Sequence, residues 1–116
     1  MKRLLNFIKS IKNWFIGLWR PTYRVKKING DTLPHKISDY QLIHLIDDGE
    51  SWSAALVCPC GCGDILQLAL FEDASPRWNL SVDNDGRPSL HPSVWRKTGC
   101  KAHFWLRDGR VYWCGN

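Results

Sequence analysis

Residues 58–63 have the sequence Cys-Pro-Cys-Gly-Cys-Gly. This run places the thiols of Cys58, Cys60 and Cys62 within five residues of one another. Thiols this close together are hard to explain as packing, whereas thiolates are ligands that zinc and iron select. A proline and two glycines allow the backbone to turn tightly and to point N–H groups at the sulfurs, which favours the thiolate form. The run therefore predicts a metal-binding loop.

A second group of ligand types follows further along the chain, in Cys-Lys-Ala-His at residues 100–103. Cys100 and His103 have the C-x-x-H spacing of one half of a tetrahedral zinc site. We expect one zinc ion held by this pair and by two of the three thiols of the first run, and the spacing does not select which two. Cys114 is either a further ligand or a small buried hydrophobic residue. An iron–sulfur centre of the Rieske type needs two histidines, and the first run contains none.

The segments around these two groups are short, rich in β-branched and aromatic residues, and bounded by turn residues, which is typical of β-strands. Asp-Asn-Asp-Gly at residues 83–86 and Arg-Asp-Gly-Arg at residues 107–110 predict hairpins. We expect a single, mostly β domain of about seven short strands, stabilised by zinc because so small a body buries too little apolar surface. Eight segments are candidates for these strands: 23–28, 41–46, 52–57, 65–71, 78–82, 87–90, 102–106 and 111–114.

The N-terminal part differs in character from this body. Residues 4–19 have the apolar spacing of an amphipathic helix, which Pro21 ends. We therefore divide the chain into a basic helical arm, residues 1–21, and a Cys/His metal-binding β domain, residues 22–116. The helix docks on its own domain, lies on a membrane surface or docks on a partner, and the pattern leaves these three open.

The charges are also divided unevenly. Residues 1–27 contain eight basic residues and no acidic one, whereas residues 28–116 contain eight basic and eleven acidic residues. Because the positive charge is confined to the arm and does not form a stripe on the body, the pattern argues against a nucleic-acid partner. The chain shows no signal-peptide pattern and no apolar stretch of membrane-spanning length. We expect a cytoplasmic protein, peripheral to a membrane if the helix binds one, in which clustered cysteines bind metal or catalyse rather than form disulfides.

Catalytic candidates are fewer than metal ligands. The turn His91-Pro92-Ser93 places a hydroxyl and an imidazole together, so Ser93 and His91 are candidate catalytic residues, with His103 as another possible base. The G-x-S-x-G elbow of α/β-hydrolases is not present. Asp64, beside the cysteine run, is a candidate to orient a metal ligand from outside the coordination sphere.

Four stretches together resemble a family of small uncharacterised bacterial proteins, filed as a domain of unknown function. They are the N-terminal arm, LVCPCGCGDILQL, RWNLSVDNDGRPSLHPSVW and GCKAHFWLRDGRVYWC, and they cover nearly the whole chain. The resemblance implies metal binding through Cys58, Cys60, Cys62, Cys100 and His103, and less firmly through Cys114. Some members of that family are encoded beside bacterial E1-like, E2-like and ubiquitin-like proteins. The resemblance therefore implies a role in ubiquitin-like conjugation or its reversal, with a ubiquitin-like protein or its E1/E2-like enzymes as partners.

Two functional hypotheses follow from these observations. In the first, four protein ligands close the zinc site, and the protein is an accessory or interaction module of the conjugation pathway. In the second, the protein is a hydrolase, a peptidase or esterase that removes ubiquitin-like conjugates with a zinc-bound water or with a serine or cysteine nucleophile. Because thiolate-rich sites are more often structural, the sequence favours the interaction module.

Overall fold

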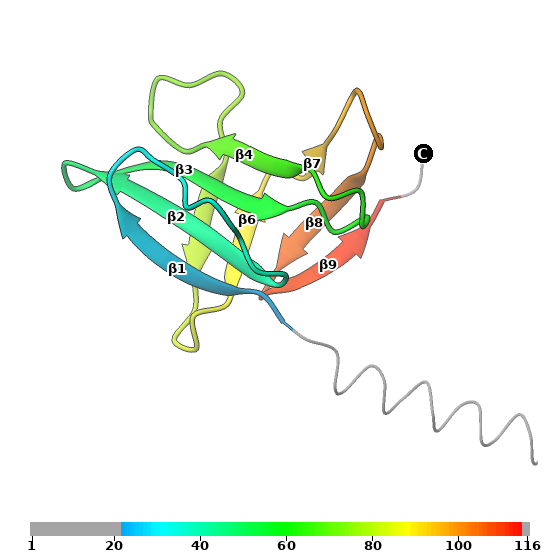
Figure 1. The fold of residues 1–116 in the computed structure, drawn as a ribbon, viewed down its shortest axis with the longest axis horizontal. Helices are drawn as coiled ribbons and strands as arrows, with labels where there is room; N and C mark the ends of the chain where they lie inside the picture. The colour runs from blue at the N-terminus through cyan, green and yellow to red at the C-terminus, as the bar shows by residue number, and fades with distance from the viewer. Residues whose placement is uncertain (1–21, 115–116) are drawn as a thin grey trace, which may run out of the picture.

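The computed structural model describes residues 22–114, and these residues form nine β-strands and no helix (Figure 1). The predicted mostly β class is confirmed. The predicted helix at residues 4–19, and the arm to which it belongs, lie outside the described residues. The strands are β1 Arg24–Asn29, β2 Gln41–Asp47, β3 Glu50–Val57, β4 Ile65–Ala69, β5 Asn79–Val82, β6 Pro88–His91, β7 Val94–Trp95, β8 His103–Arg107 and β9 Arg110–Trp113.

Strands β1 to β4 form one sheet in the order β1-β2-β3-β4. β2, β3 and β4 pair antiparallel through short connections, whereas β1 pairs parallel with β2. A parallel pair cannot be joined by a tight turn, so residues 30–40 cross from one end of β1 to the start of β2. The sequence predicts strands at 23–28 and 41–46, but nothing in it reveals that these two strands are parallel.

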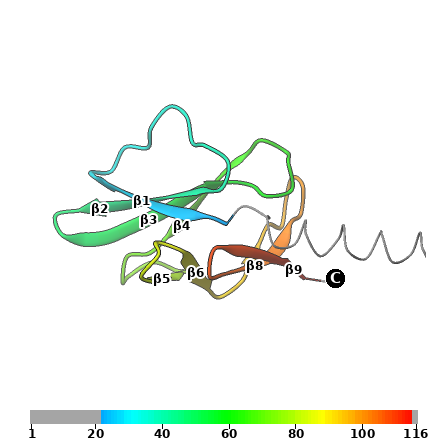
Figure 2. The same cartoon turned by 90° about the horizontal axis from the view of Figure 1, so that it is seen from below.

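A second layer packs against one face of this sheet (Figure 2). It consists of the hairpin β5-β6 and of a three-stranded sheet in the order β7-β8-β9. The main core lies between the layers, where Leu42 and Leu56 of the first sheet belong to the same buried cluster as Leu90, Phe104 and Leu106 of the second. Burial of these side chains stabilises the fold by about 25 cal/mol for each Å² of apolar surface removed from water.

The opposite face of the four-stranded sheet is covered by residues 30–40, which lie above it in Figure 2. Ile37 of this segment packs with Ile43, Leu45 and Ala55 in a second, smaller core. With both faces covered, β2 has no solvent-facing side, which explains its nearly continuous apolar sequence.

The layers bring two loops to the same end of the molecule. The β3–β4 loop carries the cysteine run, and the β7–β8 loop carries Cys100. β7, with only two residues, is the strand that the sequence does not predict. It pairs with β8 through Val94 opposite Phe104 and Trp95 opposite His103, which fixes the start of the β7–β8 loop. Within residues 22–114 the structure contains no helix that could cross a membrane.

Candidate functional site

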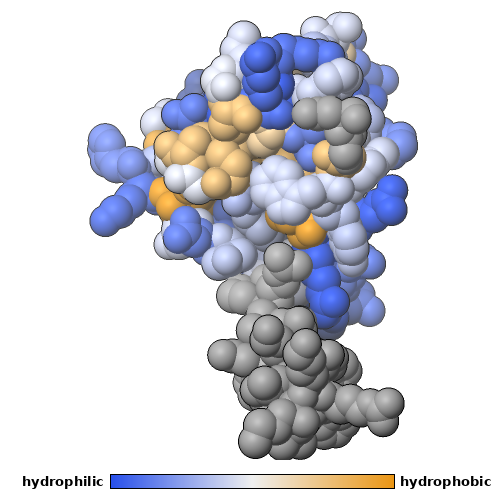
Figure 3. Space-filling model, turned by 90° about the vertical axis from the view of Figure 1, so that its right-hand side faces the viewer, coloured by the Kyte–Doolittle hydropathy of each residue, from blue (hydrophilic) through white to orange (hydrophobic). Residues whose placement is uncertain are grey.

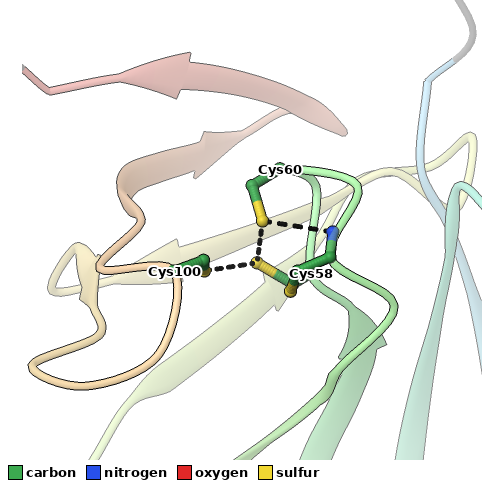
Figure 4. A group of neighbouring side chains, drawn as sticks. Cys58, Cys60 and Cys100 are labelled. Carbon is green, nitrogen blue, oxygen red and sulfur yellow. Dashed lines mark hydrogen bonds between the residues drawn. The ribbon is translucent and has the colours of Figure 1, made fainter.

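The β3–β4 and β7–β8 loops bring four thiols together (Figure 4). The sulfurs of Cys58, Cys60, Cys62 and Cys100 all lie within 4.8 Å of one another. Cys58 Sγ is 3.4 Å from Cys60 Sγ and 3.6 Å from Cys100 Sγ. Cys58 is buried and the other three are exposed. The cluster therefore closes a contact between residues 42 positions apart in the chain.

The glycines and proline of the run build this loop as the sequence predicts. Gly61 and Gly63 have φ angles of 92° and 86°, a left-handed region that favours glycine. The backbone N–H of Cys58 donates to the Asp64 carbonyl at 2.8 Å, which closes the base of the loop. The backbone N–H of Cys62 points at Cys60 Sγ at 3.3 Å. The predicted N–H···S contact is therefore present at Cys60.

The thiols affect one another's ionisation. The backbone N–H of Ala102 and, after it, the Cys60 and Cys58 thiols lower the pKa of Cys100 to about 6, against the opposing effect of burial. Hydrogen bonding to Cys100 and Cys62 raises the pKa of Cys60 to about 12. The pKa of Cys58 is raised chiefly by burial. Four thiols arranged in this way cannot all ionise unless a cation lies among them.

Arg96 belongs to the same group, although the sequence does not single it out. Its guanidinium donates to Cys100 Sγ at 3.1 Å and to Cys62 Sγ at 3.6 Å, and it forms an ion pair with Asp64 at 3.1 Å. The Cys100 contact, followed by Asp64, raises the pKa of Arg96. Asp64 thus reaches the cluster through Arg96. An arginine four residues before a cysteine carries no distinctive sequence signal.

The donor set fits a metal ion. Four sulfurs placed tetrahedrally about 2.3 Å from a zinc ion would be about 3.8 Å apart, and the measured separations of 3.4 and 3.6 Å approach that value. The four thiolates would fill a tetrahedral sphere without water, and the charge of Arg96 would offset part of their negative charge. A sphere filled in this way would leave no position open for a substrate.

His103 lies in a different environment from the one that its spacing predicts. The cysteine group does not include it, and its Nε2 lies 3.0 Å from Ser93 Oγ. His103 is the first residue of β8, and Ser93 directly precedes β7. In the tautomer with its proton on Nδ1, His103 accepts the hydroxyl proton of Ser93.

Two tryptophans hold this pair in place. The ring of Trp95 stacks on the imidazole of His103, with centroids 4.8 Å apart and planes 12° from parallel. The Trp78 indole N–H donates to the carbonyl of Ser93 at 3.3 Å. Ser93 and His103 are both half-buried. The hydroxyl and imidazole are therefore oriented by packing and are still reachable from solvent.

The side chains of the remaining predicted residues, His91 and Cys114, belong to neither group. His91 is exposed, and its ring lies 5.7 Å from the Trp105 ring. Cys114 is outside the cysteine group; its backbone N–H donates to the His103 carbonyl at 2.9 Å. Of the two imidazoles considered as a base for Ser93, the one that the structure places within hydrogen-bonding distance is His103.

A second serine–histidine pair occurs at the β2–β3 hairpin, where His44 Nε2 lies 2.9 Å from Ser51 Oγ. His44 is buried among apolar neighbours, and its Nδ1 has no hydrogen-bond partner within the described residues. Burial and then the charge of Lys27 lower the pKa of His44. The pair differs from Ser93–His103 in that its imidazole is enclosed in the first sheet.

Comparison with known proteins gives one match. A family model described as "Bacterial ubiquitination-like system serine protease (BubE)" matches residues 29–114, which contain all four clustered cysteines and both serine–histidine pairs. No curated protein matches the chain, and no solved structure matches it.

Proposed function

This chain belongs to the BubE family of bacterial ubiquitination-like system serine proteases, and on that premise we propose that it is a serine hydrolase with Ser93 as nucleophile and His103 as general base. The observation that carries the proposal is the 3.0 Å contact between Ser93 Oγ and His103 Nε2. A serine hydroxyl is a weak nucleophile until an adjacent base accepts its proton. This contact has the length that proton transfer requires.

The reaction follows from the two groups. Ser93 Oγ attacks the carbonyl carbon of an ester or amide while its proton passes to His103 Nε2. The protonated imidazole then gives that proton to the leaving oxygen or nitrogen as the carbon–heteroatom bond breaks, which leaves an acyl group on Ser93. Water, deprotonated by the same imidazole, releases the acyl group. The stacked Trp95 keeps the ring plane fixed through these steps.

Ser93–His103 suits this role better than His44–Ser51. His44 is an interior residue of β2, and its pKa is lowered. The structure has cavities of about 390 Å³ and 260 Å³, and neither His44 nor Ser51 lines either of them. His91 and Trp105, by contrast, neighbour the Ser93–His103 pair and line a cavity. The family match covers both pairs and does not distinguish them.

Membership of the family supports a place in a ubiquitination-like pathway, and we propose a ubiquitin-like conjugate as the substrate. Two large aromatic side chains on the sheet face that carries the pair are exposed, Trp95 at 52% and Tyr112 at 50%. Figure 3 views this end of the molecule and shows pale and orange residues gathered between blue hydrophilic ones. Exposed aromatic residues are enriched where proteins bind one another. Such a surface suits a folded protein substrate.

We further propose that the four clustered cysteines hold one zinc ion and that this ion is structural. The chemistry of the donors favours zinc in a reduced compartment. With Ser93 supplying the nucleophile, no zinc-bound water is needed. A closed zinc site is compatible both with the interaction-module hypothesis and with a hydrolase that uses a serine nucleophile, and these two differ over Ser93 and His103.

The test is cleavage of a fusion between the pathway's ubiquitin-like protein and a reporter, together with labelling of the protein by a fluorophosphonate probe. Ser93→Ala and His103→Ala should each lose at least about a thousandfold in kcat/KM. Ser51→Ala is the matched control, because it removes the hydroxyl of the other serine–histidine pair, and it should retain activity. Zinc content and melting temperature are measured for every variant.

Equal loss in Ser51→Ala, or full activity in Ser93→Ala, would move the site elsewhere. A wild-type protein that is folded and zinc-loaded, yet neither cleaves nor is labelled, would leave the interaction module as the function.

A further inference from the structure

A cavity of about 260 Å³ lies between the β5–β6 hairpin and β8. His91 and Trp105 line it, and their rings lie 5.7 Å apart. His91 is two residues before Ser93, and Trp105 is two residues after His103 on the same face of β8. Two residues of extended chain span about 7 Å. A substrate side chain one or two positions from the scissile carbonyl would therefore reach this cavity.

The lining of the cavity combines apolar side chains with polar ones, and its polar members besides the single guanidinium are Asn79, Ser81, Ser89 and His91. Leu80, Leu90 and the Trp105 ring contribute apolar surface, and Arg107 contributes a guanidinium. Arg107 lies over the Trp105 ring, with its Cζ 4.5 Å from the centroid, so the ring holds it in place. No aspartate or glutamate lines the cavity. Among residues 22–114, Arg107 forms no ion pair.

We propose that this cavity is a substrate subsite for an acidic side chain and that Arg107 is its specificity-determining residue; the inference rests on the hydrolase function proposed above. The apolar side chains of the lining accept the aliphatic stem of a glutamate or aspartate, and the guanidinium pairs with its carboxylate. Arginine is suited to this because its planar donors match both carboxylate oxygens. The substrate class is then a polypeptide or its ester with an acidic residue one or two positions from the bond that is cleaved.

The probes are short peptide esters that are identical except at the two residues preceding the ester, where glutamate, glutamine or lysine is placed in turn. At one of these positions wild type should prefer glutamate over glutamine by about tenfold in kcat/KM. Arg107→Gln should abolish the preference while still cleaving the glutamine ester. Arg107→Glu should reverse it in favour of lysine, which a purely structural role for Arg107 would not produce.

Arg110→Gln is the matched control. Arg110 is the pairing partner of Arg107 across the β8–β9 hairpin and is equally basic, but it lines a different cavity. It should leave the glutamate preference unchanged. Equal cleavage of all three esters by wild type, or the same loss in Arg110→Gln as in Arg107→Gln, would overturn the inference.

A binding measurement separates this inference from the proposed chemistry. Calorimetry of the Ser93→Ala protein with the same peptides, as stable amides, reports the subsite even if no ester is cleaved. The glutamate peptide should bind about tenfold more tightly than the glutamine peptide, and the difference should shrink at high salt. Equal affinities would refute the subsite. Absence of cleavage together with a clear glutamate preference in binding would count against the hydrolase function alone.

Discussion

At the scale of single residues, His44 shows the cost of a buried imidazole. It lies in the interior of β2 with only 9% of its surface exposed. Its Nε2 meets the Ser51 hydroxyl, whereas its buried Nδ1 has no partner within the described residues. Burial disfavours the charged imidazolium, and the charge of Lys27 adds to this effect, so the pKa is lowered.

The pH dependence of stability should carry this signature. As the pH falls below about 6.5, the usual histidine pKa, the unfolded chain takes up a proton at His44 before the native protein does. The free energy of unfolding therefore decreases with falling pH until the lower native pKa is passed. His44→Gln should reduce the slope of melting temperature against pH between about pH 5 and 7, measured against wild type. The exposed His35→Gln is the control, and a slope identical in wild type and His44→Gln would refute the assignment.

At the scale of elements, the turn between β8 and β9 connects three parts of the fold. Gly109 has a φ of 77°. Its backbone N–H donates to the Pro88 carbonyl at 2.8 Å, and its carbonyl accepts from the Tyr23 N–H at 2.7 Å. A Cβ at this position would lie 2.8 Å from the Tyr23 carbonyl oxygen. The close approach of β1, β6 and the β8–β9 hairpin therefore depends on the missing side chain.

Replacement of Gly109 by alanine should destabilise the protein by about 3 kcal/mol or more, because backbone atoms must move apart. Gly49→Ala is the control: Gly49 has a nearly equal φ of 79° in the β2–β3 turn, and its added Cβ would meet nothing within 4 Å. That change should cost only the conformational penalty of about 1–2 kcal/mol. Urea unfolding of both variants gives the comparison. Equal losses of stability in the two variants would show that the close approach of Gly109 to the Tyr23 carbonyl adds nothing to the penalty of placing alanine at a positive φ.

At the scale of the whole molecule, the cysteine cluster joins the two layers. Cys58, Cys60 and Cys62 lie in the β3–β4 loop of the four-stranded sheet, and Cys100 lies in the β7–β8 loop of the other layer. Bound structural zinc contributes an apparent free energy of about 10 kcal/mol or more, comparable to the whole stability of a small domain. The cluster would also keep the β7–β8 loop close to the start of β8, where His103 lies.

The purified protein should contain about one zinc per chain by elemental analysis. Cys100→Ser should lose the metal and unfold, because the remaining three thiols cannot close the site. Cys114→Ser provides the control, since its thiol is outside the cluster, and it should keep both zinc and the wild-type melting temperature. A folded, metal-free wild type, or an unchanged melting temperature in Cys100→Ser, would contradict a structural zinc.

The local chemistry of the chain determined the elements. Turn residues and strand-forming segments placed most strands within one or two residues of their bounds, as for the predicted 41–46 and the observed Gln41–Asp47. The proline and glycines of residues 58–63 determined a tight loop. These features depend on neighbours in the sequence, so spacing reveals them. The two-residue β7 escaped prediction because so short a strand has no periodicity of its own.

Only the tertiary structure decided which side chains meet. His103 follows Cys100 by three residues, and that spacing cannot show whether the imidazole turns toward the thiols or away from them. β8 begins at His103, and its pairing with β7 places the ring against Trp95 and Ser93, while Cys100 stays in the loop. The parallel pairing of β1 with β2 and the position of Arg107 beside the cavity were decided in the same way. Each depends on which segments pair or pack together in the folded chain, and the spacing of residues along the sequence does not record that.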